Sequence, residues 1–268
     1  MKHQKLRTLV ACTGLALACL SSANSQTLVD LSDTSVNSGM INGAIYMIDG
    51  TQPAGTGIFG RNSGGVFLTI QNNGVEEGYN TSARNIMDTK RIPQWNHEIT
   101  VATLGVVTVD NKDYVPFLLD INETANDNKR LLSLDDVKIF TTQATGITNP
   151  TLSSLVNDSR LTLRYDMDAG ANNSVLLDYG RSGSGSGKAD MALLVPVSVF
   201  DGAAAGDTVY FYSRFGGDVV GASADSSADA GFEEWTAGTG RPITVIPEPS
   251  AMLLGLIGAL GLLIRRKR

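Results

Sequence analysis

The chain has 268 residues, of which 21 are basic and 27 acidic, and both of its cysteines, Cys12 and Cys19, lie close to the N-terminus. Residues 26–249 keep 14 of the basic and all 27 of the acidic side chains, so their net charge is −13, and such a surface repels nucleic acid. Because these residues include no cysteine, they cannot form disulfides, thiolate nucleophiles or cysteine-ligated metal sites.

The first 25 residues predict a secretory signal peptide. An apolar run of 12 residues, 9–20, follows a basic start and is much shorter than the roughly 20 residues that span a bilayer. Ala23 and Ser25 form the pair of small residues that favours cleavage after Ser25. The Sec translocon and signal peptidase are therefore expected partners. The alternative is lipidation of Cys19, which is disfavoured because Ala16 stands where such motifs usually carry leucine.

Between the termini, short runs of β-branched and aromatic residues alternate with turn signals, and no long helical period is present. Their number and spacing predict an all-β fold, a single antiparallel β-sandwich of jelly-roll-like type over residues 26–240, with a linker over 241–246. The expected strands are 44–48, 66–71, 98–109, 114–121, 136–140, 160–167, 174–179, 191–200 and 208–215.

Local patterns add detail to this expectation. In residues 161–168 every odd position is apolar and every even one polar, which predicts one face toward a core and one toward water. The stretch "TVDNKDY" predicts a hairpin turn, because its Asp and Asn suit turn positions. Pro196 indicates an edge or a bulge. Short helices are expected only near 149–159 and 82–90.

Two loops rich in Asp and Asn are the candidates for a metal site. Calcium takes six to eight oxygen ligands, which Asp and Asn side chains and loop carbonyls supply. The second loop resembles the start of an EF-hand loop, but Leu177 stands where that motif needs an acid. A looser calcium site is one interpretation, and ordinary Asx turns are the favoured one. The candidate ligands are Asp120, Asn122, Glu123 and Asp127 in the first loop and Asp166 and Asp168 in the second.

The C-terminus has three parts in a fixed order. A Pro-Glu-Pro motif keeps the backbone extended, an apolar stretch follows over 251–264, and a basic tail ends the chain. Fourteen helical residues extend about 21 Å, short of the roughly 30 Å hydrocarbon core, and the tail resists translocation. A removable sorting segment is favoured, and a permanent anchor is the alternative. The motif residues are Pro247, Glu248 and Pro249, with Arg265, Arg266, Lys267 and Arg268 in the tail.

This arrangement over 247–268 resembles the sorting signal of the PEP-CTERM proteins. The resemblance implies processing by an exosortase, a membrane cysteine protease of Gram-negative bacteria, after transient anchoring in the inner membrane. It also implies delivery to the cell surface or to an extracellular matrix rich in polysaccharide. The central region is similar to uncharacterised extracellular domains of that family at residues 55–59, 76–82, 117–123, 131–140, 164–168, 176–200 and 230–235.

The sequence contains few residues or motifs that are typical of catalysis, so we expect that the protein is not an enzyme. His97, the one histidine after the signal peptide, is expected in a loop or at a strand edge, and no Gly-x-Ser-x-Gly motif accompanies it. The Glu doublets 76–77 and 233–234 could supply a glycosidase pair, but acids on a solvated surface are the favoured interpretation.

The sequence thus favours a structural or adhesive protein of a polysaccharide-rich surface layer or biofilm. A carbohydrate-binding module is the alternative, and a polysaccharide hydrolase is a distant third. Aromatic candidates for sugar stacking, which more often lie in cores, are Trp95, Tyr79, Tyr179 and Trp235. Asn-x-Ser/Thr sequons, which indicate surface loops in a host that glycosylates, occur at Asn80, Asn122, Asn157 and Asn172.

Overall fold

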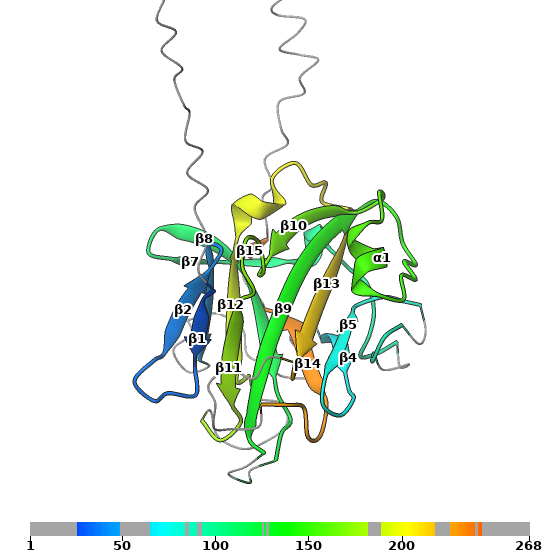
Figure 1. Cartoon of the computed structure of the whole chain (residues 1–268). Helices are drawn as coiled ribbons and strands as arrows, with labels where there is room; N and C mark the ends of the chain where they lie inside the picture. The colour runs from blue at the N-terminus through cyan, green and yellow to red at the C-terminus, as the bar shows by residue number, and fades with distance from the viewer. Residues whose placement is uncertain are drawn as a thin grey trace, which may run out of the picture.

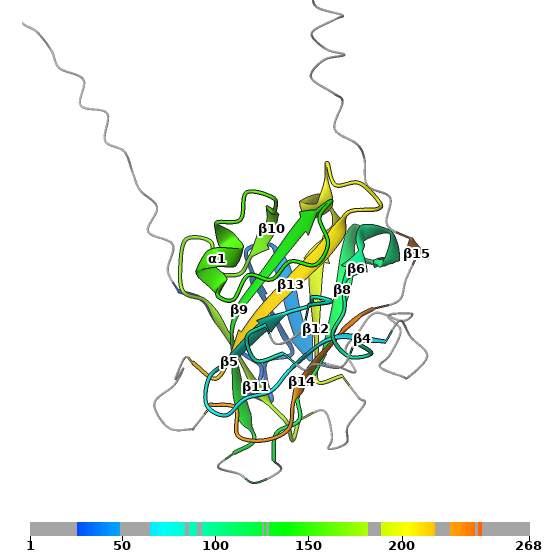
Figure 2. The ribbon, with the colours of Figure 1, turned by 90° about the vertical axis from the view of Figure 1, so that its right-hand side faces the viewer.

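The computed structural model describes residues 26–48, 65–83, 86–89, 93–124, 126, 129–181, 189–217, 226–238 and 241–242. In this part of the chain almost all regular structure is β, arranged in two sheets (Figures 1 and 2). The predicted signal peptide over 1–25 and the sorting signal over 247–268 lie outside the described residues.

The first sheet has the strand order β1-β11-β9-β13-β5, with β10 beside the second half of β9 and β6 beside the start of β13. The β1–β11 pair is parallel, so the expectation of a wholly antiparallel sandwich is wrong at this edge, and the other pairs of the sheet are antiparallel. The long, curved β9 runs through the middle of this sheet with β13 alongside (Figure 1). The strands are β1 (Leu28–Asp30), β5 (Glu76–Tyr79), β6 (Ile99–Thr100), β9 (Leu131–Thr142), β10 (Thr162–Asp166), β11 (Ser174–Asp178) and β13 (Thr208–Phe215).

The second sheet has the order β15-β7-β8-β12-β3-β2, and β14 pairs with the second half of β8 and with β4. All of its pairs are antiparallel. Arg241 and Pro242, expected in the linker, form β15. The strands are β2 (Ser38–Ile41), β3 (Ala44–Ile48), β4 (Val66–Ile70), β7 (Gly105–Val109), β8 (Lys112–Asp120), β12 (Met191–Pro196), β14 (Glu233–Ala237) and β15 (Arg241–Pro242).

One apolar core joins the two sheets. The ring of Phe211 on β13 lies 4.9 Å from Phe117 on β8 and 4.6 Å from Trp235 on β14, measured between centroids. These residues belong to one buried cluster that draws side chains from both sheets, as in a β-sandwich. The all-β expectation is therefore confirmed in its main outline.

A second apolar cluster covers part of the outer face of the first sheet, under the short helix α1 (Leu152–Val156) (Figure 2). Leu155 is buried there against Phe140 of β9 and Tyr210 of β13. Thr151 caps the helix, because its hydroxyl accepts the Ser154 amide. The helix predicted near 149–159 is thus confirmed. The window 82–90 contains no helix among its described residues, and the two remaining helical turns are η1 (Val101–Thr103) and η2 (Val197–Phe200).

A β-bulge in β10 interrupts the alternation predicted for residues 161–168. Leu163 pairs with Phe140 and Tyr165 with Ile139, so Arg164 has no partner residue on β9. Tyr165 therefore joins the main core, whereas Leu163 is 44% exposed. The expectation of one uniform apolar face is wrong here, because an extra residue shifts the two-residue period.

Two tight turns agree with their local sequence. Asp110 and Asn111 both have positive φ, at 49° and 61°, in the β7–β8 hairpin predicted from "TVDNKDY". Asn42 and Gly43 form the equivalent turn between β2 and β3. The edge or bulge expected at Pro196 is wrong, because β12 lies between β8 and β3. Pro196 ends this strand, where pairing with β3 has already stopped at Leu194, so its missing N–H costs no hydrogen bond to β3.

Candidate functional site

Three of the predicted calcium ligands, Asp120, Asn122 and Glu123, lie at the end of β8 and in the loop that follows it. Asp120 and Glu123 are buried. The Asn122 Nδ2 donates to the Phe232 carbonyl at 2.8 Å. Both carboxylate oxygens of Glu123 lie 3.2 Å from the amide of Asp229, which donates to them. Asn122 and Glu123 therefore connect this loop by hydrogen bonds to the segment before β14.

The turn after β10 carries two more predicted ligands, whose oxygens already contact protein donors. Lys138 Nζ lies 2.5 Å from Oδ1 of Asp166, which also accepts the Asp168 amide at 2.9 Å. Asp168 Oδ1 accepts the Asn173 amide at 2.8 Å. Asn42 Nδ2 donates to two carbonyl oxygens of the turn at 3.0 and 2.8 Å. A lysine and several amides thus stabilise this turn, in the manner of an Asx turn.

The structure does not bring these two loops together. Asp166 pairs with Lys138 on β9, whereas the loop after β8 leads into Leu131, seven residues earlier on that strand. The two loops therefore adjoin different parts of β9. Asp127 lies outside the described residues. Among the residues that are described, no group of three or more His, Cys, Asp or Glu could hold a metal ion. Calcium binding therefore stays a prediction without support from the described loops.

Three glutamates from separate parts of the sequence form a buried group, which we call the glutamate cluster. It consists of Glu76 at the start of β5, Glu123 after β8 and Glu233 at the start of β14, with exposed fractions of 1%, 4% and 1%. Glu233 is hydrogen-bonded to Glu76. Two carboxyl groups share a hydrogen bond only when one of them carries a proton. The expectation that both Glu doublets are solvated is thus wrong for Glu76 and Glu233.

Burial controls how this cluster titrates. It raises the pKa of Glu233 well above its usual range, and the hydrogen bond to Glu76 and the charges of Glu76 and Glu123 act in the same direction. Burial also raises the pKa of Glu123 to about 7, with a further contribution from the charges of Asp229 and Glu76. Glu123 therefore changes its charge near neutral pH.

The glutamate cluster does not have the geometry of a glycosidase pair. Both glycosidase mechanisms place a sugar between two carboxyl groups that are about 5 to 9.5 Å apart. Glu76 and Glu233 instead contact each other inside the domain. His97 lies in the loop before β6, with its Nδ1 3.1 Å from the Pro93 carbonyl oxygen. The contact between Glu76 and Glu233 leaves no space for a sugar between these two carboxyl groups.

The aromatic residues considered for sugar stacking are mostly internal. Tyr79 and Trp235 are 0% exposed, and Tyr179 packs against the main core. Trp95 is half-buried and stacks on Phe232 with ring centroids 6.4 Å apart. These side chains do not form a flat stacking platform for a sugar.

The sequon at Asn80 is internal too. Its Nδ2 donates to the carbonyls of His97 and Val209, and its Oδ1 accepts the amide of Phe211. The residue is 0% exposed. Asn80 therefore holds strands together, and the expectation of a surface loop is wrong at this sequon.

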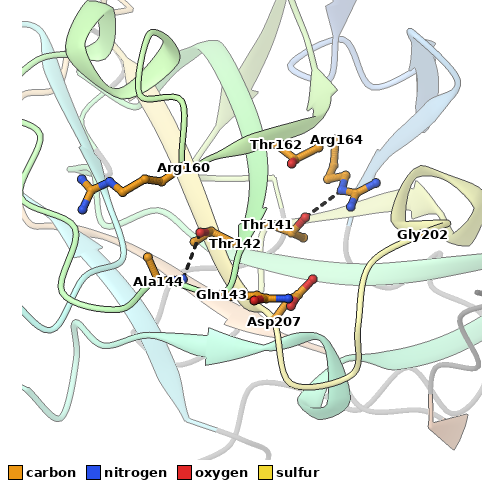
Figure 3. Close-up of a pocket in the computed structure, with 9 residues that line it drawn as sticks. All are labelled: Thr141, Thr142, Gln143, Ala144, Arg160, Thr162, Arg164, Gly202 and Asp207. Carbon is orange, nitrogen blue, oxygen red and sulfur yellow. Dashed lines mark hydrogen bonds between the residues drawn. The ribbon is translucent and has the colours of Figure 1, made fainter.

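The structure contains an open groove of about 450 Å³ at the end of β9, where β10 and β13 flank that strand (Figure 3). We call it the polar groove. Its volume falls in the range of small-molecule sites, and its lining is rich in hydroxyl, amide and charged side chains. The lining residues are Thr141, Thr142, Gln143, Ala144, Arg160, Thr162, Arg164, Gly202 and Asp207.

Arg164 is fixed in the polar groove by the β10 bulge. Since it has no partner residue on β9, its side chain is redirected, as bulges commonly do. Its Nε donates to Thr141 Oγ1 at 2.7 Å, and its Nη1 donates to the Asp201 carbonyl at 2.8 Å. The guanidinium group is thus held by two neutral acceptors.

Arg160 behaves differently from Arg164. Its Nη2 and Nε donate to the Asp158 carboxylate at 2.6 and 2.9 Å. This hydrogen bond pattern lowers the pKa of Asp158. Figure 3 shows the Arg160 guanidinium group pointing away from the other lining residues. The aliphatic part of the Arg160 side chain therefore lines the groove, and its guanidinium group is already paired with Asp158.

None of the lining residues was predicted as a site residue. One sequence feature could have pointed to the groove: Arg164 is a basic residue at a polar position of a predicted strand, in a chain that is mostly acidic. The groove depends on the bulge in β10 and on the close approach of Asp207 to β9, and neither is readable from one sequence.

The chain is similar to no family model, no curated protein and no solved structure in the comparisons. The described residues also include no helix that is long and apolar enough to cross a membrane.

Proposed function

We propose that this chain is an exported, non-enzymatic protein of the cell surface or extracellular matrix, with a structural or adhesive role in a polysaccharide-rich layer. Its delivery is supported by the signal-peptide pattern over 1–25 and by the three-part pattern over 247–268. In this proposal the Sec translocon and signal peptidase act first. An exosortase then removes the C-terminal segment, and a permanent anchor is the competing outcome.

The polar groove is the observation that supports an adhesive role. Adhesion to polysaccharide needs hydrogen-bonding groups at the surface, and the groove gathers threonine, glutamine, aspartate and arginine side chains at one place. We propose that the two sheets form a jelly-roll-like sandwich that carries this groove. The buried, mutually bonded pair Glu76 and Glu233 weighs against the hydrolase alternative.

A carbohydrate-binding module is the second candidate, and the same groove favours it. The two candidates differ in whether an isolated oligosaccharide binds with saturable affinity. A glycan array probed with the full chain in detergent separates them. Saturable binding to defined oligosaccharides supports the binding module, whereas retention in the layer without such binding supports the structural role. A protein that does neither contradicts both candidates.

A further inference from the structure

The charge of Arg164 is not matched by a neighbouring acid in the described part of the chain. There the ion pairs join Lys129 to Asp229, Arg130 to Asp178, Lys138 to Asp136 and Asp166, and Arg160 to Asp158. Arg164 has only the hydroxyl of Thr141 and the carbonyl of Asp201 as acceptors. A guanidinium group has five N–H donors in a planar fork, and these two bonds use only two of them. Among the described residues, the other three N–H donors have no protein acceptor.

An unmatched guanidinium in a groove suits a planar anion. Arginine binds carboxylates through two parallel hydrogen bonds, and such charge-assisted bonds are about twice as strong as neutral ones. The net charge of −13 over residues 26–249 opposes an anionic ligand at long range. That repulsion is largely screened beyond about 8 Å at physiological ionic strength, whereas a direct contact with Arg164 is not.

The rest of the groove suits hydroxyl groups. Gln143 offers an amide, Thr162 a hydroxyl and Asp207 a carboxylate, of which Oδ2 accepts the Ala204 amide at 2.9 Å. A carboxylate and an amide accept hydrogen bonds from hydroxyls, and the amide and the threonine also donate. A ligand that fits both parts carries one carboxylate and several hydroxyl groups. Such a ligand is a sugar acid.

We infer that the polar groove binds a uronic acid residue of an acidic polysaccharide, with Arg164 receiving the carboxylate and Gln143, Thr162 and Asp207 contacting the hydroxyls. This inference rests on the second candidate function, the carbohydrate-binding module, and assigns its ligand class. It also assigns a role to the β10 bulge, which holds the guanidinium fork in place before the ligand arrives.

The test is calorimetric titration of the full chain in detergent with trisaccharides of glucuronic, galacturonic and mannuronic acid. Each is compared with the same trisaccharide after reduction of its carboxyl groups to primary alcohols. At least one acid should bind about tenfold or more tightly than its reduced counterpart, because one charge-assisted pair is lost on reduction. Equal binding of each matched pair leaves the carbohydrate-binding function standing and overturns the acid selectivity. Binding of none of the six overturns both.

Two variants locate the selectivity. Arg164→Gln should remove the preference for the acid and leave the reduced sugar within about twofold. Gln143→Glu is the second variant, chosen because Gln143 is exposed and its replacement does not disturb packing. The added carboxylate should weaken binding of the acid about fivefold or more by repulsion and spare the reduced sugar. If both variants keep the full preference, the assignment to Arg164 is wrong.

Two matched controls accompany these variants. Arg130→Gln removes a guanidinium that is already paired with Asp178 and lies outside the groove, and Thr34→Glu adds a carboxylate on the exposed β1–β2 turn, also outside the groove. Both should bind the acid within about twofold of the wild type, since neither changes the charge at the ligand. A loss in the controls equal to that in Arg164→Gln or Gln143→Glu would indicate a general charge effect and overturn the proposed site.

Discussion

At the scale of single residues, the glutamate cluster makes stability depend on pH. Glu123 has a pKa of about 7 when folded, because burial and nearby acids favour its neutral form, and an ordinary glutamate has about 4.3. A raised carboxyl pKa adds stability that is fully present below about pH 4.3 and is lost as the pH rises through 7. The half-buried Glu234, also at about 7, acts in the same direction, and the groups facing Glu123 are Glu76, Asp229 and Glu233.

We therefore expect the free energy of unfolding to fall between pH 5 and pH 8, with a contribution on the order of 3 kcal/mol from Glu123. Glu123→Gln keeps an oxygen that can accept the Asp229 amide but cannot ionise. This variant should show a smaller fall and should exceed the wild type in stability at pH 8. Denaturant unfolding at pH 5, 6, 7 and 8 measures this. If the free energy of unfolding of the wild type stays level or rises between pH 5 and pH 8, the raised pKa of Glu123 is wrong.

Lys138 permits a second prediction at this scale. Its amine lies 3.1 Å from the Asp136 carboxylate and 2.5 Å from Asp166. Burial disfavours its charge, but the two acids outweigh burial and raise the pKa of the amine. Lys138→Met leaves Asp136 buried without its cation and should destabilise the protein by about 3 to 5 kcal/mol.

The exposed Arg160–Asp158 pair supplies the control for Lys138. Since the Arg160 side chain is 55% exposed, Arg160→Gln should change the free energy of unfolding far less than Lys138→Met does. Thermal and denaturant unfolding of both variants tests the contrast. Equal effects of the two substitutions would show that burial does not set the strength of the Lys138 pairs.

At the scale of elements, Gly231 controls how the segment before β14 meets the loop after β8. It has a φ of +78°, and a Cβ there would lie 2.1 Å from the Asn122 carbonyl oxygen. Gly146 has a similar φ of +66° but no atom within 4 Å of such a Cβ. Gly231→Ala should therefore destabilise the protein by about 3 kcal/mol or more, and Gly146→Ala by about 1 kcal/mol, the cost of the backbone conformation alone.

Unfolding free energies of both alanine variants decide this prediction. The contact with Asn122 is backbone, so no side chain can move to relieve it. A Gly231→Ala variant as stable as Gly146→Ala would mean that the 231–232 segment does not pack on Asn122 as described.

The strands that the sequence predicted are those with uninterrupted β-branched or aromatic runs, such as β3 and β13, whose bounds agree with the expected 44–48 and 208–215. The prediction missed β5 and β14, which begin with Glu76 and Glu233. Glutamate is disfavoured in strands and is seldom buried, so neither segment has the usual strand signal. These carboxyl groups are stabilised inside the domain by their contact with each other and by backbone amides, such as that of Asn72, which donates to Glu76 at 2.7 Å. The contact between Glu76 and Glu233 joins distant segments, so one sequence does not reveal it.

The site was less predictable than the fold for a related reason. The candidate ligands Asp166 and Asp168 were identified by composition, but Lys138 and Asn42, which satisfy their turn, come from other strands. The polar groove depends on Arg164, whose direction is set by a one-residue bulge. Composition indicates which groups are present, whereas register decides what they contact.

For the whole molecule, we propose separate roles for the ends and the middle of the chain. The basic residues 265–268 and the apolar stretch 251–264 would hold the protein in the inner membrane for a time. The acidic middle forms the β domain with the polar groove. Its net charge of −13 favours solubility outside the cell and leaves local contacts to select the ligand.

The central claim is that the chain is exported and then separated from its C-terminal segment at the cell surface. The most direct test places one epitope tag before Pro247 and another after Arg268 in a bacterial host that has an exosortase, with an exosortase-deficient strain as control. Mature surface protein should keep the first tag and lack the second, and the deficient strain should retain both in the membrane. Persistence of the second tag on mature protein in the exosortase-positive host would contradict it.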